Sequence, residues 1–181
     1  MAPRTVFTES EITVNRNVFD NSNEYVISGN YPINLEASTV PANPRVDVLS
    51  GSHQFQTSVN LLSDTVVDVE SNATLIFNNA LNLNSHVLTK TGSGTLAINN
   101  ILTSGGGTLN CSQGKCSGSG TIGGDVNNDG GTISPGNSPG EMSMDGLEAS
   151  VVPEPSSLLL TLLGLLLLGV MSLVPRTRVS T

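Results

Sequence analysis

Three small sets of residues in this chain have types and spacings that permit chemistry. In the first, Asp125, Asn127 and Asp129 place oxygen atoms at alternate positions before a glycine, as in the first half of a calcium-binding loop. The glutamate that closes such a loop is absent, because Gly136 stands at its position. We therefore expect a plain turn here, with a loosely bound Ca²⁺ as the alternative.

The second set is a pair of cysteines, Cys111 and Cys116, separated by four residues. In an exported chain the pair could close a small disulfide in a surface loop, and free thiols are the other reading. A redox motif has two residues between its cysteines, and a metal site needs further Cys or His ligands nearby. The spacing therefore favours neither redox chemistry nor metal binding.

The remaining titratable residues show no catalytic pattern. His53 and His86 are far apart and flank no nucleophile signature, and Asp64, Asp68 and Glu70 are typical of a solvated strand face. Carbohydrate-cleaving β-helices use clustered carboxylates or bases with aromatic rings for sugar stacking. The glycine-rich second half of the chain contains no aromatic residue, so we expect a protein that is not an enzyme and has no cofactor.

The third set lies at the end of the chain, where Pro153-Glu154-Pro155 precedes an uncharged, leucine-rich run, Leu158–Val174. A helix that begins at Ser156 and ends with this run spans about 28 Å, close to the thickness of a bilayer core. Arg176 and Arg178 follow at once, which predicts a cytoplasmic tail and an external remainder. An ordinary single-pass anchor is the alternative reading.

The order of these parts resembles the PEP-CTERM sorting signal of Gram-negative bacteria. That family signal joins a Pro-Glu-Pro motif, one transmembrane helix and a basic terminus, and the residues that match are Val152 to Ser157, Leu158–Val174, Arg176 and Arg178. The tail departs from the family in having only two arginines. The resemblance implies export, processing near the motif by the membrane enzyme exosortase, and association with the cell envelope and exopolysaccharide.

The composition of the chain limits which other molecules it can bind. The 181 residues carry a net charge of −8, and so acidic a surface repels nucleic acid. Aromatic residues make up only 3% of the chain and end at Phe77. A core without aromatic volume is unusual for a compact globule, whereas a stack of thin β rungs does not need it.

The second half of the chain contains an internal repeat, a Gly-Thr pair followed by Leu or Ile. The copies begin at Gly94, Gly107, Gly120 and Gly131, with spacings of 13, 13 and 11 residues. We interpret each copy as a corner and strand start of a β-solenoid, with Gly at a positive-φ corner and Leu or Ile in a narrow core. A flexible Gly/Ser-rich linker is the alternative.

The repeat region also resembles the passengers of autotransporter adhesins, which are parallel β-helices on the cell surface. The strings that match run from Leu88 to Leu96 and from Gly118 to Gly140. No translocator barrel follows the repeats in this chain.

The N-terminal residues 1–17 lack the apolar segment of a signal peptide, so we expect the start of the natural protein, with further rungs, to lie upstream. The organisation predicted is an N-terminal β-rich region over 1–72, solenoid repeats over 73–147, a linker with the Pro-Glu-Pro motif over 148–157, a transmembrane helix over 158–174 and a basic tail over 175–181. Almost no helix is expected before Ser156, because no apolar period of 3.6 residues occurs there.

The fold class expected is therefore all-β, a short parallel β-solenoid followed by a single transmembrane helix. The function expected is that of an exported surface or extracellular-matrix protein, held in the membrane by one span before processing and then found at the surface or outside the cell. The alternative is a carbohydrate- or cell-binding adhesin fragment with a plain membrane anchor.

Overall fold

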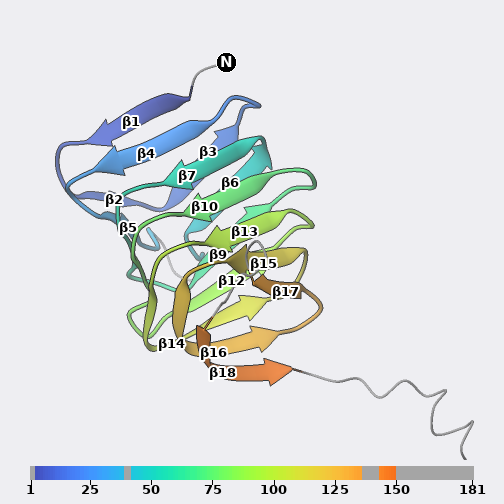
Figure 1. Cartoon of the computed structure of the whole chain (residues 1–181). Helices are drawn as coiled ribbons and strands as arrows, with labels where there is room; N and C mark the ends of the chain where they lie inside the picture. Colours follow the sequence, from blue (N-terminus) through green and yellow to red (C-terminus); the bar gives the residue numbers. More distant parts are fainter. Residues whose placement is uncertain (1–2, 39–41, 136–142, 150–181) are drawn as a thin grey trace, which may run out of the picture. The chain divides into compact units, whose positions relative to one another are not determined.

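The computed structural model describes residues 3–38, 42–135 and 143–149, all within the first of two compact units, Met1–Ala149. These residues form a parallel β-solenoid of about six turns and contain no helix (Figure 1). The all-β solenoid predicted from the sequence is confirmed. The predicted membrane helix, Leu158–Val174, lies outside the described residues.

Each rung contributes strands to three faces, of which the first is a seven-stranded sheet. Its members, in spatial order, are β1 (Arg4–Thr8), β4 (Tyr25–Gly29), β7 (Ser52–Phe55), β10 (Thr74–Phe77), β13 (Thr95–Ile98), β15 (Lys115–Gly118) and β17 (Thr132–Pro135).

The other two faces belong to one eleven-stranded sheet, because its last strands bend around a corner. The second face contains β2 (Ile12–Val14), β5 (Ile33–Leu35), β8 (Val59–Leu61) and β11 (Leu81–Asn82). The third contains β3 (Arg16–Asp20), β6 (Arg45–Ser50), β9 (Thr65–Val69) and β12 (Val87–Thr91). Three long strands, β14 (Leu102–Cys111), β16 (Thr121–Asn128) and β18 (Ser143–Ala149), run along both faces, with a register shift at the bend of β14 against β16 and of β16 against β18.

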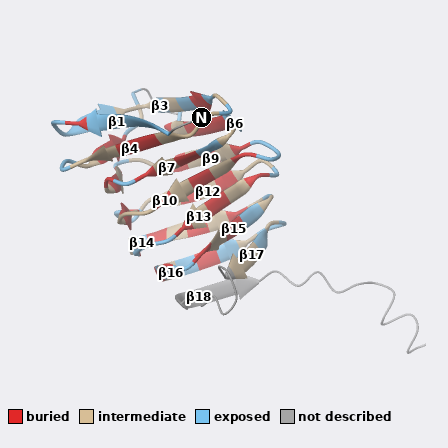
Figure 2. Ribbon diagram, turned by 45° about the horizontal axis from the view of Figure 1, so that its top comes forward, coloured by how far each residue is buried: buried red, intermediate tan, exposed pale blue. Residues whose placement is uncertain are grey.

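The core consists of inward side chains stacked in register from rung to rung. Leu75 pairs with Leu96, Leu96 with Cys116 and Cys116 with Ile133. The first three are fully or almost fully buried, because alternate residues of each strand point inward. Figure 2 shows this alternation as buried bands across the middle strands. The apolar period of two therefore builds one continuous core along the solenoid axis.

Aromatic rings occupy the same core only in the early rungs. Phe55 stacks on Phe77 with ring centroids 5.2 Å apart, and Phe77 in turn pairs with Ile98. From there on the core contains no aromatic ring, as the absence of aromatic residues after Phe77 predicts, and aliphatic side chains fill it together with Cys111 and Cys116. The sheets continue without a break across residues 72 and 73.

The Gly-Thr repeats mark corners, but on different faces. Thr95 and Thr132 begin strands of the first face, Thr121 begins on the second, and Thr108 lies where β14 enters the third. A full rung takes longer than the repeat, since Thr74 pairs with Thr95 and Thr95 with Lys115. The 13-residue spacing of the repeat therefore carries the chain past two of the three faces, and a full turn takes longer.

The predicted conformation of the repeat glycines is wrong. Positive φ belongs to the preceding glycines, such as Gly118 at 137°, and not to the glycine of each Gly-Thr pair. Gly120 is required for another reason, because a Cβ there would lie 1.9 Å from the carbonyl oxygen of Asn100 on the preceding rung. The positive-φ glycine turns the chain, and both glycines let two rungs come into contact, since a Cβ at Gly118 would lie 1.9 Å from the carbonyl oxygen of Ile98.

Candidate functional site

The two cysteines are joined by a disulfide. Cys111 ends β14 and Cys116 lies in β15, with their Cα atoms 6.4 Å apart. Both side chains are buried in the core, not in a surface loop as the sequence suggested. The reason is that both residues occupy inward positions of their strands, Cys111 below Lys90 and Cys116 below Leu96. The disulfide therefore fastens the corner between the third and first faces.

The candidate calcium ligands do not form a loop. Asp125 and Asn127 lie on β16 with exposed side chains, and exposed Asp129 follows the strand. An extended strand does not curl its oxygens around one ion as a calcium loop does. Among the residues that the structure describes, no group of three or more His, Cys, Asp or Glu side chains is placed to hold a metal ion.

The acidic residues of the third face belong to an ion-pair ladder instead. Asp47 is buried and accepts from Arg16 Nε at 2.7 Å and from Arg45 Nε at 3.0 Å. Arg45 also reaches Asp68 on the next rung at 3.2 Å, and Asp68 accepts from the hydroxyl of Thr91 at 2.9 Å. These contacts connect four successive strands, β3, β6, β9 and β12. Asp68 thus serves to hold rungs together, while its neighbour Glu70 is exposed.

Asp64, the third acidic residue of that predicted strand face, supports the following rung. Its carboxylate accepts from the backbone N–H of Val87 at 2.9 Å and lies 3.5 Å from Nδ1 of His86. His86 and Asp64 are therefore neighbours, although they are distant in sequence.

His53 is fully buried and both of its ring nitrogens contact backbone groups. Nδ1 accepts from the N–H of Tyr25 at 3.1 Å, and Nε2 lies 2.8 Å from the carbonyl oxygen of Ser50. The neutral tautomer with its proton on Nε2 satisfies both contacts. Its ring also stacks on Phe19, with centroids 4.7 Å apart. This histidine is a packed core residue and has no nitrogen available for proton transfer.

Lys90 is also fully buried, at an inward position of β12. Its ammonium donates to the carbonyl oxygens of Thr91 and Gly92, each at 2.7 Å, and of Gln113 at 3.3 Å. Burial lowers the pKa of Lys90 to about 8, and the carboxylate of Asp68 opposes this shift. The lysine of the autotransporter-like string is therefore a structural cation at a corner.

Asparagine side chains form a further ladder on the second face. Asn82 donates to Asn60 at 2.7 Å, Asn60 donates to Asn34 at 3.0 Å, and Asn34 donates to Glu11 at 2.5 Å. Asn60 and Asn34 each both donate and accept along the stack, so these polar side chains help to hold successive rungs together.

The sorting residues fall outside this structural account. Pro153, Glu154, Pro155, Arg176 and Arg178 lie beyond the described residues, so their predicted roles remain predictions. Within the described part of the chain, no helix has the length and apolar character needed to cross a membrane.

Comparison with known proteins adds no functional assignment. No family model matches the chain, and neither a curated protein nor a solved structure matches it.

Sequence reasoning missed the buried charges, Asp47 and Lys90, and the buried His53. The only indication in the sequence is where these residues stand in their strands. Each is either next to a buried apolar residue or two residues from one, and therefore on the same inward side. What the arrangement can do chemically is limited, because these groups are already engaged in contacts that hold the rungs together.

Proposed function

We propose that this protein is an exported, non-enzymatic surface or extracellular-matrix protein, sorted by exosortase through its C-terminal segment. The observation that carries the proposal is the order Pro153-Glu154-Pro155, uncharged Leu158–Val174, then Arg176 and Arg178. This order implies a single transmembrane helix after the β-solenoid, with its basic end in the cytoplasm.

The non-enzymatic part of the proposal draws support from the buried titratable groups. The amine of Lys90 contacts three carbonyls, both ring nitrogens of His53 contact the backbone, and Asp47 has two arginine partners. A general acid or base needs a proton-exchanging atom that can reach a substrate. Because these side chains hold the fold together and cannot reach a substrate, they support a structural role for the protein over a catalytic one.

In the proposed mechanism, the prolines keep the Pro153-Glu154-Pro155 segment extended just outside the bilayer. The helix holds the segment at that depth, and the arginines fix its orientation. Exosortase then cuts near the motif, and the solenoid is released or transferred to the cell envelope or exopolysaccharide.

The test is to express the chain with an added signal peptide and tags at both ends, in hosts with and without exosortase. We expect the surface form to lose its C-terminal tag near Pro153 only when the enzyme is present. Glu154→Gln should reduce this loss, whereas Glu148→Gln, a matched change in β18 outside the motif, should not. An intact tail in both hosts would make the protein a plainly anchored solenoid and end the sorting proposal.

A second candidate is a carbohydrate- or cell-binding adhesin. It is favoured by the exposed rings of Phe7 and Tyr31, which are 58% and 48% accessible in the first two rungs and could stack on sugars. Selective retention of the chain on exopolysaccharide that Tyr31→Ala abolishes would support the adhesin. Equal retention of both chains would speak against it.

A further inference from the structure

The corner between β16 and β17 contains an aspartate followed by a glycine, Asp129-Gly130. Both residues are exposed, and Gly130 has a positive φ of 95°. The N–H groups on either side, those of Asp129 and Gly131, both donate to the carbonyl oxygen of Cys111 at 3.1 Å. The N–H of Gly130 between them has no hydrogen-bond partner among the residues that the structure describes. The corner thus places a free backbone nitrogen next to an exposed carboxyl group.

These two groups permit a reaction within the chain. Attack of the Gly130 nitrogen on the side-chain carboxyl carbon of Asp129 closes a succinimide ring, and the carboxyl hydroxyl leaves with the N–H proton as water. A second water then opens the ring. Addition at the former backbone carbonyl leaves the main chain running through the side chain, as isoaspartate, whereas addition at the side-chain carbonyl restores aspartate. Water is the only co-reactant, and the mass of the chain is unchanged.

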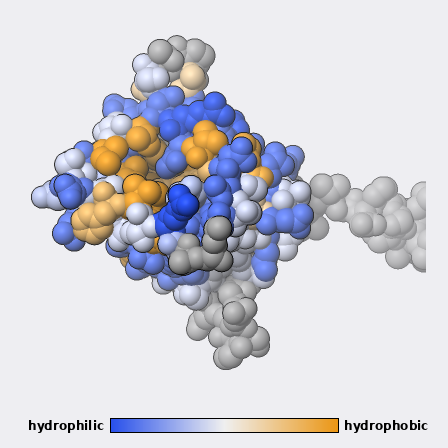
Figure 3. Space-filling model, turned by 90° about the horizontal axis from the view of Figure 1, so that it is seen from above, coloured by the Kyte–Doolittle hydropathy of each residue, from blue (hydrophilic) through white to orange (hydrophobic). Residues whose placement is uncertain are grey.

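We propose that Asp129 is a site of spontaneous conversion to isoaspartate. Gly130 carries no Cβ that would hinder the approach of its nitrogen, and this nitrogen has no hydrogen bond to lose first. In the described part of the chain the Asp129 carboxylate has no ion-pair partner to restrain it. The corners are also open to water, and Figure 3 shows hydrophilic residues around much of the rim of the solenoid.

Other candidate side chains lack this combination. In Asn72-Ala73 and Asn84-Ser85, the second N–H donates to a backbone carbonyl at 3.0 Å and is not free to attack. Asp47 and Asp68 are held by arginine side chains. These groups would have to break an existing contact before a ring could close.

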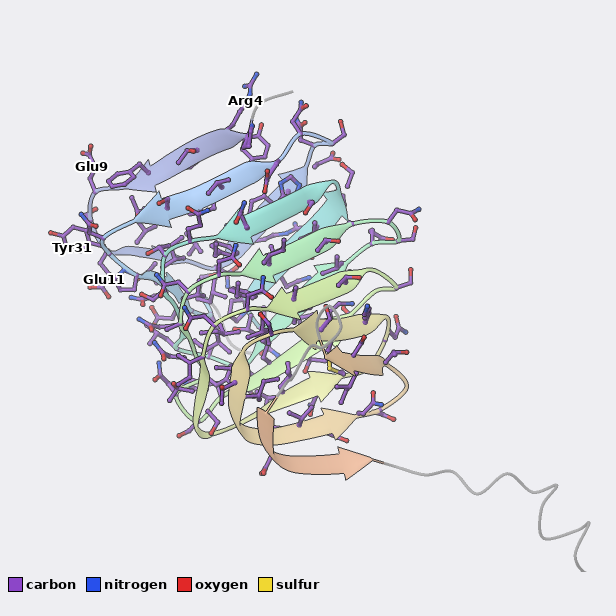
Figure 4. All side chains as sticks on the ribbon, in the orientation of Figure 1. Arg4, Glu9, Glu11 and Tyr31 are labelled. Atoms are coloured by element: carbon purple, nitrogen blue, oxygen red, sulfur yellow. A yellow bond between two sulfur atoms is a disulfide. The ribbon has the colours of Figure 1, made fainter. Side chains whose placement is uncertain are left out.

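Exposure alone does not select a site either. Glu9 and Glu11 follow β1 and are exposed (Figure 4), but a glutamate must close a ring one atom larger, which forms more slowly. The other Asp-Gly pair of the chain, Asp145-Gly146, lies inside β18, where Gly146 pairs with Asp125 of β16. We expect slower conversion there, because pairing keeps the backbone extended.

Conversion at Asp129 should loosen the pairing of β17 with β15. Isoaspartate adds one methylene to the main chain between the two N–H groups that share the carbonyl of Cys111. The lengthened corner no longer matches this spacing, and the next contact along the chain is the N–H of Thr132, which donates to Gly114 at 2.8 Å. The proposal does not depend on the sorting function, and its test does not involve the Pro-Glu-Pro motif.

The test incubates the full chain in mild detergent at physiological temperature, in mildly acidic and in mildly alkaline buffer. Protease digestion followed by electron-transfer fragmentation distinguishes isoaspartate from aspartate at equal mass and reports each position separately. We expect isoaspartate to accumulate at Asp129, ahead of Asp145. Conversion should be faster in the acidic buffer, because ring closure expels the hydroxyl of a protonated carboxyl group. Methyl transfer by an isoaspartyl methyltransferase gives an independent count.

Two variants provide the comparison. Asp129→Glu should abolish the signal at this corner and leave the fold intact, because the side chain is exposed. Asp125→Glu, a matched change at an exposed residue of β16 that Val126 follows, should leave the conversion of Asp129 unchanged. In hydrogen exchange, the Thr132 amide should lose protection as the protein ages, and should keep it in aged Asp129→Glu protein.

Three results would overturn the proposal. The first is the absence of isoaspartate at Asp129 in both buffers, whether or not Asp145 converts. The second is an equal methyl-transfer signal from the Asp129→Glu protein. The third is a converted chain whose Thr132 amide remains fully protected, which would show that the corner accommodates the added methylene and that β17 stays paired.

Discussion

The ammonium of Lys90 donates to the carbonyl oxygen of Gly92 over 2.7 Å, inside the corner that joins β12 to β13. Gly92 itself has a positive φ of 73°. The carbonyl of Gln113, in the corresponding corner of the next rung, lies 3.3 Å from the same ammonium. One buried cation thus satisfies carbonyls that the turn of the chain leaves without strand partners, and it connects two rungs.

Because of this buried lysine, the free energy of unfolding should change with pH in the alkaline range. The pKa of Lys90 is lowered from 10.5 to about 8 on folding, so between these values the unfolded chain binds more protons than the folded one. The free energy of unfolding should therefore rise from pH 8 toward pH 10.5, by up to about 3 kcal/mol. Denaturant titrations at several pH values would measure it. Lys90→Met should abolish this rise, and an equal rise in both proteins would assign it to other groups.

The asparagine ladder should contribute measurably to stability. Asn60→Ala removes both the donor to Asn34 and the acceptor of Asn82, and should lower the free energy of unfolding by about 1–2 kcal/mol. Asn99→Ala is the matched control, because its exposed amide makes a single side-chain contact, to Asn78, and should cost about 0.5 kcal/mol or less. Chemical denaturation would measure both variants, and an equal loss of unfolding free energy in the two would contradict a stabilising role of the ladder.

Two glycines should respond differently to the same substitution. A Cβ at Gly120 would collide with the carbonyl of Asn100, whereas one at Gly106, with φ at 88°, would meet no atom closer than 3.6 Å. Gly106→Ala should cost about 1–2 kcal/mol through backbone strain alone. Gly120→Ala must move one rung against another and should cost more, about 3 kcal/mol. Thermal denaturation of the two variants would compare them, and the reverse order would refute the close-contact role of Gly120.

The disulfide should stabilise the fold without being essential to it. It joins residues only five apart, and so short a loop restricts the unfolded chain less than a long one does. Replacing both Cys111 and Cys116 by Ala should therefore cost about 2 kcal/mol and leave the circular dichroism spectrum of a β protein. Loss of that spectrum at room temperature would show that the solenoid depends on the disulfide to fold.

Part of the fold could be predicted from the sequence because β-solenoids repeat locally. The apolar residue after each Gly-Thr pair, such as Leu96 or Leu109, predicts an inward position, and both are fully buried. The length of a rung could not be predicted in this way. The Gly-Thr pairs recur at corners of three different faces, and only the pairing of Thr74 with Thr95 reveals the full turn.

The candidate site also has a part that could be predicted from the sequence and a part that could not. The short spacing of Cys111 and Cys116 made a disulfide conceivable from sequence, because residues so close along the chain can meet at a single turn. Asp47 and Arg16 are 31 residues apart, and Asn34 and Asn60 are 26 apart. No feature of the sequence near these residues predicts which partners they have.

The sequence by itself determined the class of fold, the acidic surface and the order of motif, apolar run and arginines at the C-terminal end, since each follows from composition or from neighbouring residues. Only the tertiary structure decided which rung lies on which, and with that the burial of Lys90, His53 and Asp47. The physical reason is that stacking joins residues about one turn apart, and the length of each turn depends on corners whose geometry is set by the rungs on either side.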